Sequence, residues 1–149
     1  MANTYTQLYA HIIFWVKNRE PLITPALEER LHKYITGIIK NLGQKPLAIN
    51  GDAFHIHIFI GFKPDKSLSD IVRDIKSFSS KFVNENKLIQ GKFYWQEGFG
   101  AFTYSHSQID TVIKYIKNQK EHHKKKTFQE EYKEFLKKFK IEYNEKYVF

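Results

Sequence analysis

The chain has 149 residues, the size of a single domain, and its 42% of hydrophobic residues are enough for a real core. The absence of cysteine excludes disulfides, thiolate zinc sites and a cysteine nucleophile, and no apolar run approaches the roughly 20 residues of a membrane span. The formal net charge of +8 favours polyanionic partners, nucleic acid first, and the segment Met1 to Thr4 lacks signal-peptide features, so we expect a cytoplasmic protein without membrane contact.

The first part of the chain predicts a strand, a helix and a second strand. Residues 5–16 are rich in aromatic and β-branched residues, which is typical of a strand. Thr24–Pro25 supplies a capping hydroxyl and a proline for a first helical turn, and apolar residues then recur at helical spacing as far as Gly43. Residues 46–49 predict a short strand, and residues 50–52 (Asn-Gly-Asp) predict a hairpin turn.

The next strand, residues 53–61, carries the first candidate site. Side chains two apart on a strand point to the same face, so His55 and His57 lie together opposite a row of Phe and Ile residues. Imidazoles this close can hold one metal ion. Taken alone, the pattern is equally compatible with two solvated histidines without a function.

The following residues complete a sheet. Residues 67–70 have the spacing of a capping box, and a helix with one apolar face follows. Residues 92–96 predict a fourth strand, which residues 101–104 could continue beyond a bend. The order strand, helix, strand, strand, helix, strand is that of the split βαβ, or ferredoxin-like, fold of the α+β class, which RNA-recognition domains share. We therefore expect an antiparallel sheet with helices on one face, a central histidine strand and an open second face.

A later segment carries the second candidate site. Residues 107–110 resemble a helix start, and a ridge separate from the apolar stripe of this helix holds Tyr115, Gln119 and His122. Residues four apart on a helix are neighbours, so Tyr115 and Gln119 can reach one common point. From Lys120 the chain becomes strongly basic, and beside a nucleophile such residues could hold phosphates.

The end of the chain predicts a C-terminal helix. Residues 127–130 form a capping box, and the apolar stripe behind it would pack on the core or on a partner subunit. With no internal repeat or linker, residues 1–149 are expected to form one domain. Its parts would be the sheet core 1–104, the tyrosine helix and basic segment 107–126, and the C-terminal helix and tail 127–149.

Chemistry connects the two candidate sites. A tyrosine hydroxyl can attack phosphorus and hold a broken strand as a phosphotyrosine ester, but its free pKa of about 10 makes it a poor nucleophile unaided. A divalent cation that polarises the phosphate would help. His55, His57 and the amide oxygen of Gln119 would hold such a cation and leave positions open for phosphate and water. The hard amide oxygen favours Mg²⁺ or Mn²⁺, although the imidazoles alone would also accept Zn²⁺ or Ni²⁺.

These residues resemble the motifs of a known family. His55-Ile56-His57 has the form of the HUH motif, and Tyr115 to Gln119 resembles the tyrosine motif of the single-tyrosine HUH transposases, which move bacterial insertion sequences as single-stranded DNA. The resemblance implies that Tyr115 is the nucleophile, forming a 5′-phosphotyrosine link and a free 3′-OH, and that His55, His57 and Gln119 hold the metal. It also implies a homodimer, in which the tyrosine helix can complete the partner's site, and recognition of imperfect hairpins near the element ends.

Other polar residues have less specific predictions. His11 and His106 have no assigned role, and His122 is expected to be a surface imidazole. Charge and expected exposure alone select candidates for DNA contacts: Lys17, Arg19, Arg73, Lys76 and Lys120.

Two other functions stay open at this stage. A non-catalytic module that binds RNA or single-stranded DNA would share the element order, but such modules stack bases on aromatic residues where this chain has His55 and His57. A metal-dependent phosphodiesterase that uses the histidine pair and water would not need Tyr115. A covalent protein–DNA adduct distinguishes the transposase from both.

Overall fold

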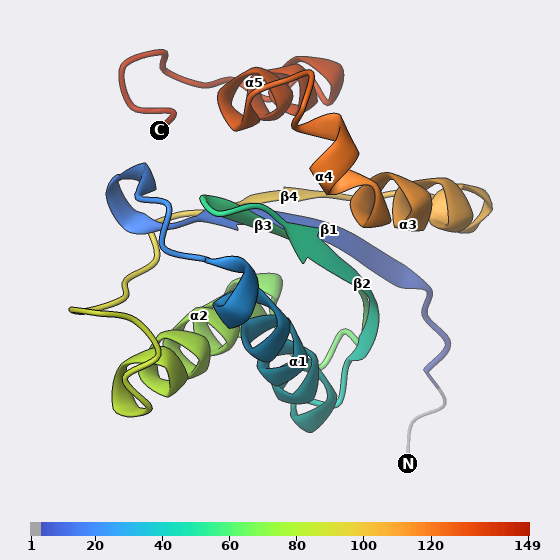
Figure 1. Cartoon of the computed structure of the whole chain (residues 1–149). Coiled ribbons are helices and arrows are strands. Elements are labelled where there is room, and N and C mark those ends of the chain that lie inside the picture. Colours follow the sequence, from blue (N-terminus) through green and yellow to red (C-terminus); the bar gives the residue numbers. More distant parts are fainter. Residues whose placement is uncertain (1–3) are drawn as a thin grey trace.

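A four-stranded sheet positions the rest of the chain. The computed structural model describes residues 4–149, so Met1 to Asn3, where we expected no signal peptide, lie outside the described residues. The strands are β1 (Leu8–Trp15), β2 (Lys45–Gly51), β3 (His55–Phe62) and β4 (Gly100–Phe102). They pair antiparallel in the order β2-β3-β1-β4, with β3 and β1 at the centre (Figure 1). This confirms the predicted α+β, ferredoxin-like fold.

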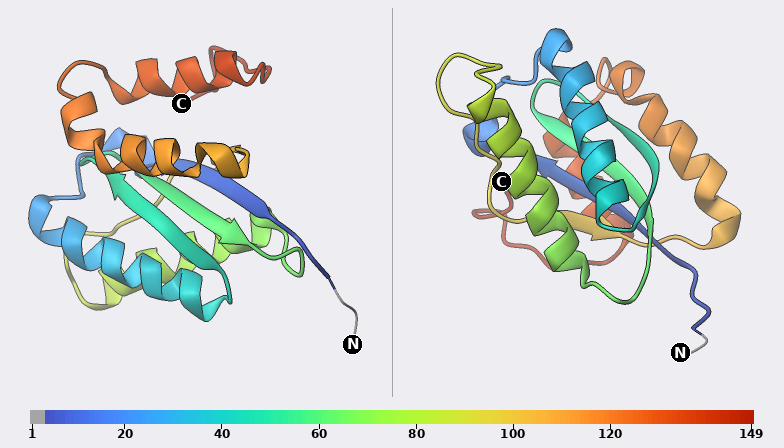
Figure 2. Two further views of the ribbon diagram at one scale, coloured as in Figure 1. Left: turned by 90° about the vertical axis from the view of Figure 1, so that its right-hand side faces the viewer. Right: turned by 90° about the horizontal axis from the view of Figure 1, so that it is seen from below.

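The lower face of the sheet packs on α1 (Pro25–Asn41) and α2 (Leu68–Glu85), which lie side by side (Figure 2). Thr24 caps α1 as predicted, by accepting a hydrogen bond from the amide of Leu27, and Ser67 caps α2 in the same way. The strands contribute mainly aliphatic residues to this core, namely Ala10, Ile12, Phe14, Ile56, Ile58 and Ile60. The hydrophobic core therefore forms on the side away from the histidines.

The upper face is covered by the last part of the chain, so the expectation of an open face was wrong. α3 (Ile109–Lys117) packs on β2 and β3, where Ile116 joins Phe59 in a small apolar cluster. The short α4 (Gln119–His122) then leads to α5 (Phe128–Lys138), which runs above the sheet (Figure 1).

Aromatic packing explains why α5 covers this face. The ring of Trp15 on β1 lies 5.3 Å from that of Phe128 and 5.1 Å from that of Tyr132, both on α5. Ile13 and Phe102 belong to the same buried cluster. Large rings gain most from burial, and the ring of Phe149, 6.2 Å from that of Trp15, adds to the cover. The apolar stripe predicted for the C-terminal helix is thus used on the core of its own chain.

The fourth strand forms in the predicted continuation and not in residues 92–96, because β4 overlaps residues 101–104. Within residues 92–96, only Trp95 pairs with the sheet, through an isolated bridge to Val16, and β4 follows later. The side chain of Asn84 explains the difference, because it accepts from the amide of Phe93 at 2.7 Å and donates to its carbonyl at 3.0 Å. Backbone groups that a strand partner would satisfy are bound by α2 instead.

The predicted turn and the predicted late helix also differ in detail. Gly51 still belongs to β2, so the connection to β3 comprises residues 52–54. A 3₁₀ turn, His106–Gln108, precedes α3. At the other end of α3 the amide of Asn50 donates to the carbonyl of Lys117 at 3.0 Å, which supplies that carbonyl with a partner outside the helix where α3 gives way to α4.

Two further statements concern the chain as a whole. Within the part of the chain that the structure describes, no helix is long and apolar enough to cross a membrane. The division into the segments 1–104, 107–126 and 127–149 stays a prediction. The packing of the last segment on the upper face shows only that its side chains share the buried clusters of the sheet.

Candidate active site

His55 and His57 project from β3 toward the upper face, as strand alternation predicts. Both side chains are fully buried, because the C-terminal helices cover them. The ring of Phe128 lies 4.4 Å from that of His55, and the two imidazole centroids are 5.0 Å apart. Histidines shielded in this way are not the solvated pair that the sequence alone left open.

A second side chain holds each of these rings through its Nδ1 atom. His55 Nδ1 donates to Asp52 Oδ1 at 2.6 Å, and the amides of Phe54 and His55 fix the same oxygen at 2.8 and 3.1 Å. His57 Nδ1 lies 2.7 Å from Nε2 of His11 on β1. His11, which had no assigned role, is thus the buried partner of His57. Both Nε2 atoms are left to face the space beneath α5.

Tyr115 and Gln119 reach this space from α3 and α4. The ring of Tyr115 lies 6.0 Å from that of His57, and Gln119 is fully buried. The amide nitrogen of Gln119 donates to Glu131 at 3.1 Å, and its oxygen lies 2.9 Å from Nε2 of His123. The structure therefore brings all four predicted site residues together within one chain, while their roles stay predictions.

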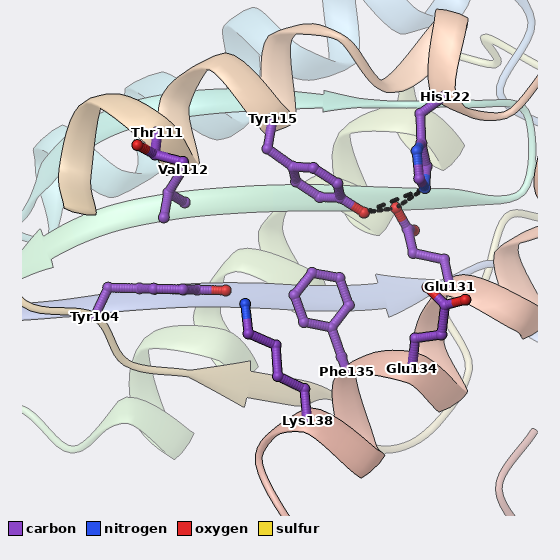
Figure 3. Close-up of a pocket in the computed structure, with 9 residues that line it drawn as sticks. All are labelled: Tyr104, Thr111, Val112, Tyr115, His122, Glu131, Glu134, Phe135 and Lys138. Carbon is purple, nitrogen blue, oxygen red and sulfur yellow. Dashed lines mark hydrogen bonds and ion pairs between the residues drawn. The ribbon is translucent and has the colours of Figure 1, made fainter.

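The centre of this cluster is Glu131 on α5, a residue that the sequence analysis did not single out. Its side chain is buried, with 2% of its surface exposed. Its Oε1 atom faces the Nε2 atoms of three imidazoles, those of His57 at 2.9 Å, His123 at 3.3 Å and His55 at 3.5 Å. Its Oε2 atom accepts a hydrogen bond from the Tyr115 hydroxyl and lies 3.1 Å from Nε2 of His122 (Figure 3). His122 is therefore part of the cluster and not a surface imidazole.

Burial and hydrogen bonding oppose each other in this cluster. Burial raises the pKa of Glu131, but its close contacts with three imidazoles outweigh this effect and hold the pKa well below its usual range. Burial and the neighbouring carboxylate both raise the pKa of Tyr115, and burial lowers the pKa of His57 to about 4. Burial also lowers the pKa of His55, but the hydrogen bond to Asp52 and the nearby carboxylate of Glu131 more than offset it and raise the pKa. In this arrangement Glu131 is ionised and the phenol keeps its proton.

Four members of the cluster fit a divalent cation. The ligand atoms of His55, His57, His123 and Glu131 all lie within 4.8 Å of one another. Nε2 of His55 is buried without a hydrogen-bond partner, which is costly unless its lone pair has another use. Imidazole and carboxylate donors suit zinc, manganese and related ions. The donor chemistry therefore fits the predicted kind of cofactor and includes two residues that the sequence analysis missed.

A cavity of about 250 Å³ opens beside the nucleophile candidate (Figure 3). It lies between α3 and α5, and Tyr104, Phe135 and Lys138 line it together with Tyr115 and Glu131. Burial raises the pKa of Tyr104 to about 12, so its phenol is neutral at physiological pH. Through this cavity a ligand can reach the Tyr115 side chain, and the cationic residue Lys138 is part of the cavity wall.

Two of the five predicted DNA-contact residues lie near the cluster. Arg19, at the end of a 3₁₀ turn (Lys17–Arg19), lines a groove of about 650 Å³ together with Asp52 and His123. Lys120 on α4 pairs with Glu28 and so joins α4 to α1. Contact of either residue with DNA stays a prediction.

The structure does not bring the other three residues to the cluster. Arg73 pairs with two acidic neighbours on α2, under the lower face. Lys76, also on α2, donates to the carbonyl of Gln96 at 2.8 Å, and burial lowers its pKa to about 8. The ammonium of Lys17 lies 5.8 Å from the ring of Tyr94. Selection by expected exposure failed most clearly for Lys76, because its stem is packed against the core.

The sequence contains a signal for the missed carboxylate. Glu131 follows Phe128 by three residues and precedes Tyr132, so it falls on the apolar stripe of α5, where a charge needs a partner. His123 follows Gln119 by four residues, one helical turn further on. His106, by contrast, lies 3.3 Å from the hydroxyl of Tyr9 and makes no contact with the cluster.

Comparison with known families identifies the chain. The family model described as transposase IS200 like matches residues 4–119. The chain belongs to this family. The match ends at Gln119, so His123 and Glu131 lie outside the matched residues. No curated protein sequence gives a significant match.

Two solved structures share the fold of this family member. A candidate transposase from Deinococcus radiodurans R1 is 22% identical and superposes with a TM-score of 0.63, over 80% of this chain and 95% of that chain. A REP-associated tyrosine transposase bound to a REP hairpin is 16% identical, with a TM-score of 0.58, over 79% of this chain and 70% of that chain. At these identities the similarity establishes the fold, and membership of the transposase family makes DNA processing in transposition the general function.

Proposed function

We propose that the chain cleaves and rejoins single-stranded DNA at the ends of an insertion sequence, through a 5′-phosphotyrosine intermediate on Tyr115. The observation that carries the proposal is the convergence of Tyr115 with His55 and His57 in one buried cluster of one chain. The elements that carry these residues are remote in sequence, and a merely structural tyrosine has no reason to meet two metal-ligand candidates.

The reaction follows from the chemistry of these groups. The Tyr115 oxygen attacks the scissile phosphorus, its proton passes to the carboxylate of Glu131, and the bond from phosphorus to the 3′ oxygen breaks. The departing 3′ oxygen takes up a proton from solvent water and becomes a free 3′-OH, and Glu131 releases the proton of the phenol to solvent. Rejoining is the reverse, with a 3′-OH attacking the phosphotyrosine. Because burial and Glu131 raise the pKa of the phenol, the resting arrangement is unreactive without charge compensation.

A divalent cation would supply that compensation. His55 and His57 would hold it, with Gln119 as the further ligand that the resemblance implies, and Mg²⁺ or Mn²⁺ is the predicted ion. When bound, the ion neutralises the phosphate charge and orients it for in-line attack. Asp52 and His11 fix the two rings through their Nδ1 atoms and so keep both Nε2 lone pairs directed at the cluster.

The proposed substrate is a DNA hairpin next to a single-stranded cleavage site. The net charge of +8 supports binding to a polyanion, and the REP-associated relative was solved with a hairpin bound. Arg19 and Lys120 are the proposed backbone contacts. Since Tyr115 bonds to Glu131 of its own chain, the geometry favours action within one subunit, and a homodimer stays part of the proposal.

The experiment is an adduct assay on two tyrosine variants. Labelled single-stranded DNA from the element's end is incubated with the protein and Mn²⁺, and a denaturing gel separates free DNA, cleaved DNA and covalent adduct. We expect Tyr115→Phe to bind hairpin DNA and form no adduct. Tyr104→Phe is the matched control, because Tyr104 lines the same cavity but makes no bond to Glu131, and it should form adduct as the wild type does.

The same gel tests the two alternative functions. Cleavage without adduct would show hydrolysis by water at the histidine pair, and binding without cleavage would show a non-catalytic module. Adduct formation by Tyr115→Phe at the wild-type level would refute the assignment of the nucleophile.

A further inference from the structure

Two residues outside the segment that the family model matches complete the buried cluster. We infer that His123 and Glu131, in place of Gln119, are the further metal ligands, and that with His55 and His57 they form a site of four protein ligands. The inference deepens the proposed function, since it rests on a metal ion at the histidine pair. It adds the C-terminal segment, through α5, to the metal site.

All three imidazoles of the proposed site are held through their Nδ1 atoms. His123 Nδ1 donates to the carbonyl of Lys126 at 2.8 Å, just as Asp52 holds His55 and His11 holds His57. All three imidazoles are therefore bound at Nδ1 and leave Nε2 directed at the same carboxylate. Outer partners of this kind are typical of metal-ligating histidines, because they fix the ring and its tautomer.

Hydrogen bonds alone leave one buried nitrogen of the cluster without a partner. Oε1 of Glu131 lies 2.9 to 3.5 Å from three Nε2 atoms, and Nε2 of His55 is left without a partner. A four-coordinate ion with bonds of about 2.0–2.1 Å keeps its ligand atoms about 3.4 Å apart. The distances from Oε1 of Glu131 to the three Nε2 atoms, 2.9 to 3.5 Å, are close to that value, and all four ligand atoms lie within 4.8 Å of one another. An ion held between them would give Nε2 of His55 the partner that it lacks.

The carboxylate of Glu131 contacts both the imidazoles and the proposed nucleophile. Glu131 directs Oε1 at the imidazoles and Oε2 at the Tyr115 hydroxyl. A metal held by Glu131 is thereby connected to the nucleophile through a single side chain. Three imidazoles disfavour Mg²⁺, which prefers oxygen, and favour Mn²⁺, Co²⁺ or Zn²⁺. With four protein ligands, a six-coordinate ion such as Mn²⁺ keeps two positions for substrate, whereas four-coordinate Zn²⁺ keeps none.

Metal titration of the metal-free full chain, without DNA, tests the inference. Binding of Zn²⁺ and Mn²⁺ is measured by competition with a chromophoric chelator, and Co²⁺ absorption reports the coordination number. We expect Glu131→Gln and His123→Asn each to weaken Zn²⁺ binding by on the order of 100-fold, at least as much as loss of an outer partner does. The matched control is Glu130→Gln, an exposed neighbour on α5, which should bind Zn²⁺ as the wild type does.

A measurement on the wild type keeps the test independent of variant folding. Hydrogen exchange of the α5 amides should slow when Zn²⁺ is added, because the ion would tie α5 to β3. Unchanged exchange, or wild-type affinity in both ligand variants, would overturn the inference. If His57→Ala loses metal while Glu131→Gln and His123→Asn keep it, the histidine pair binds the ion without the C-terminal segment. If metal binding needs Glu131 but no phosphotyrosine forms with DNA, the inference stands and the proposed function fails.

Discussion

The two faces of the sheet use the same strands for opposite purposes. Below, Ile56 and Ile58 pack into a mainly aliphatic core against α1 and α2. Above, their neighbours His55 and His57 lie equally buried, but among imidazoles, a phenol and a carboxylate. The lower face gains free energy from each side chain, at about 25 cal/mol per Å² of buried apolar surface. The upper face buries groups that are costly without partners.

This contrast separates the residues that stabilise the fold from those that carry the proposed function. The fully buried polar side chains on the upper face include His11, His55, His57 and Gln119, and each has a polar partner there. Each side chain in such a network depends on the others, because loss of one member leaves the buried polar group of another without a hydrogen-bond partner. The lower face should therefore determine whether the chain folds, and the upper face what it does.

Adjacent substitutions on β3 give the largest test of this comparison. His57→Ala should abolish metal-dependent cleavage in a folded protein, because it removes a proposed ligand from the upper face. Ile58→Ala should lower the free energy of unfolding by about 2–5 kcal/mol and leave metal affinity unchanged, because it opens a cavity in the lower core. Urea denaturation and metal titration of both variants measure the two effects. Normal turnover by His57→Ala would remove the metal-site argument.

The strand-borne half of the site was predictable from local rules. Alternation on β3 places His55 and His57 together whatever the surroundings, and a spacing of four brings Tyr115 beside Gln119. Element order then gives the ferredoxin-like sheet with β3 near the centre. Each step needs only neighbouring residues, so none depends on knowing the complete fold.

The remaining half depends on long-range packing. Glu131 meets His57 across 74 positions of sequence, because the rings of Phe128 and Tyr132 seat α5 on Trp15. His11 meets His57 through the β1–β3 register, which no periodicity reveals. The expectation of an open sheet face was wrong for the same reason. The apolar stripe of α5 predicted that this helix would pack on something, but not which surface of the chain it would cover.

Asp52→Asn tests the outer partner of His55 and its pH dependence. Metal and proton compete for Nε2, and the raised pKa of His55 means that metal affinity should begin to fall while the pH is still above its usual pKa of 6.5. Without the Asp52 carboxylate, one of the two groups that raise this pKa is lost while burial still lowers it, so the fall should move to lower pH. At pH 8 the variant should bind metal about 10- to 100-fold more weakly. Titrations between about pH 5 and 8 measure both effects. A fall at the same pH in variant and wild type would contradict the assigned role.

His11→Phe separates function from stability on the upper face. Nδ1 of His11 is buried without a partner, and the ring lies 5.2 Å from Phe135 and 6.2 Å from Phe102, so a phenyl ring fits the surroundings. We expect unchanged or higher stability in thermal unfolding, with metal affinity about tenfold weaker because His57 Nδ1 loses its partner. Wild-type affinity would show that the second imidazole does not orient the first.

Alanine substitutions at two glycines, one facing α5 and one on α1, compare the faces directly and give the smallest expected effects. A Cβ at Gly100 on β4 would lie 2.6 Å from the Tyr132 ring, so Gly100→Ala must displace this ring, which packs α5 on Trp15, at a cost of about 1–3 kcal/mol. Gly37 on α1 has no atom within 4 Å of such a Cβ, and Gly37→Ala should raise stability by about 0.5–1 kcal/mol through helix propensity alone. Thermal unfolding measures both signs. Because α5 carries Glu131, Gly100→Ala should also weaken Zn²⁺ binding, while Gly37→Ala should not. Equal metal affinity in the two variants would mean that the site tolerates movement of α5, and the upper face would then be less tightly coupled to its cover than the contacts of Glu131 imply.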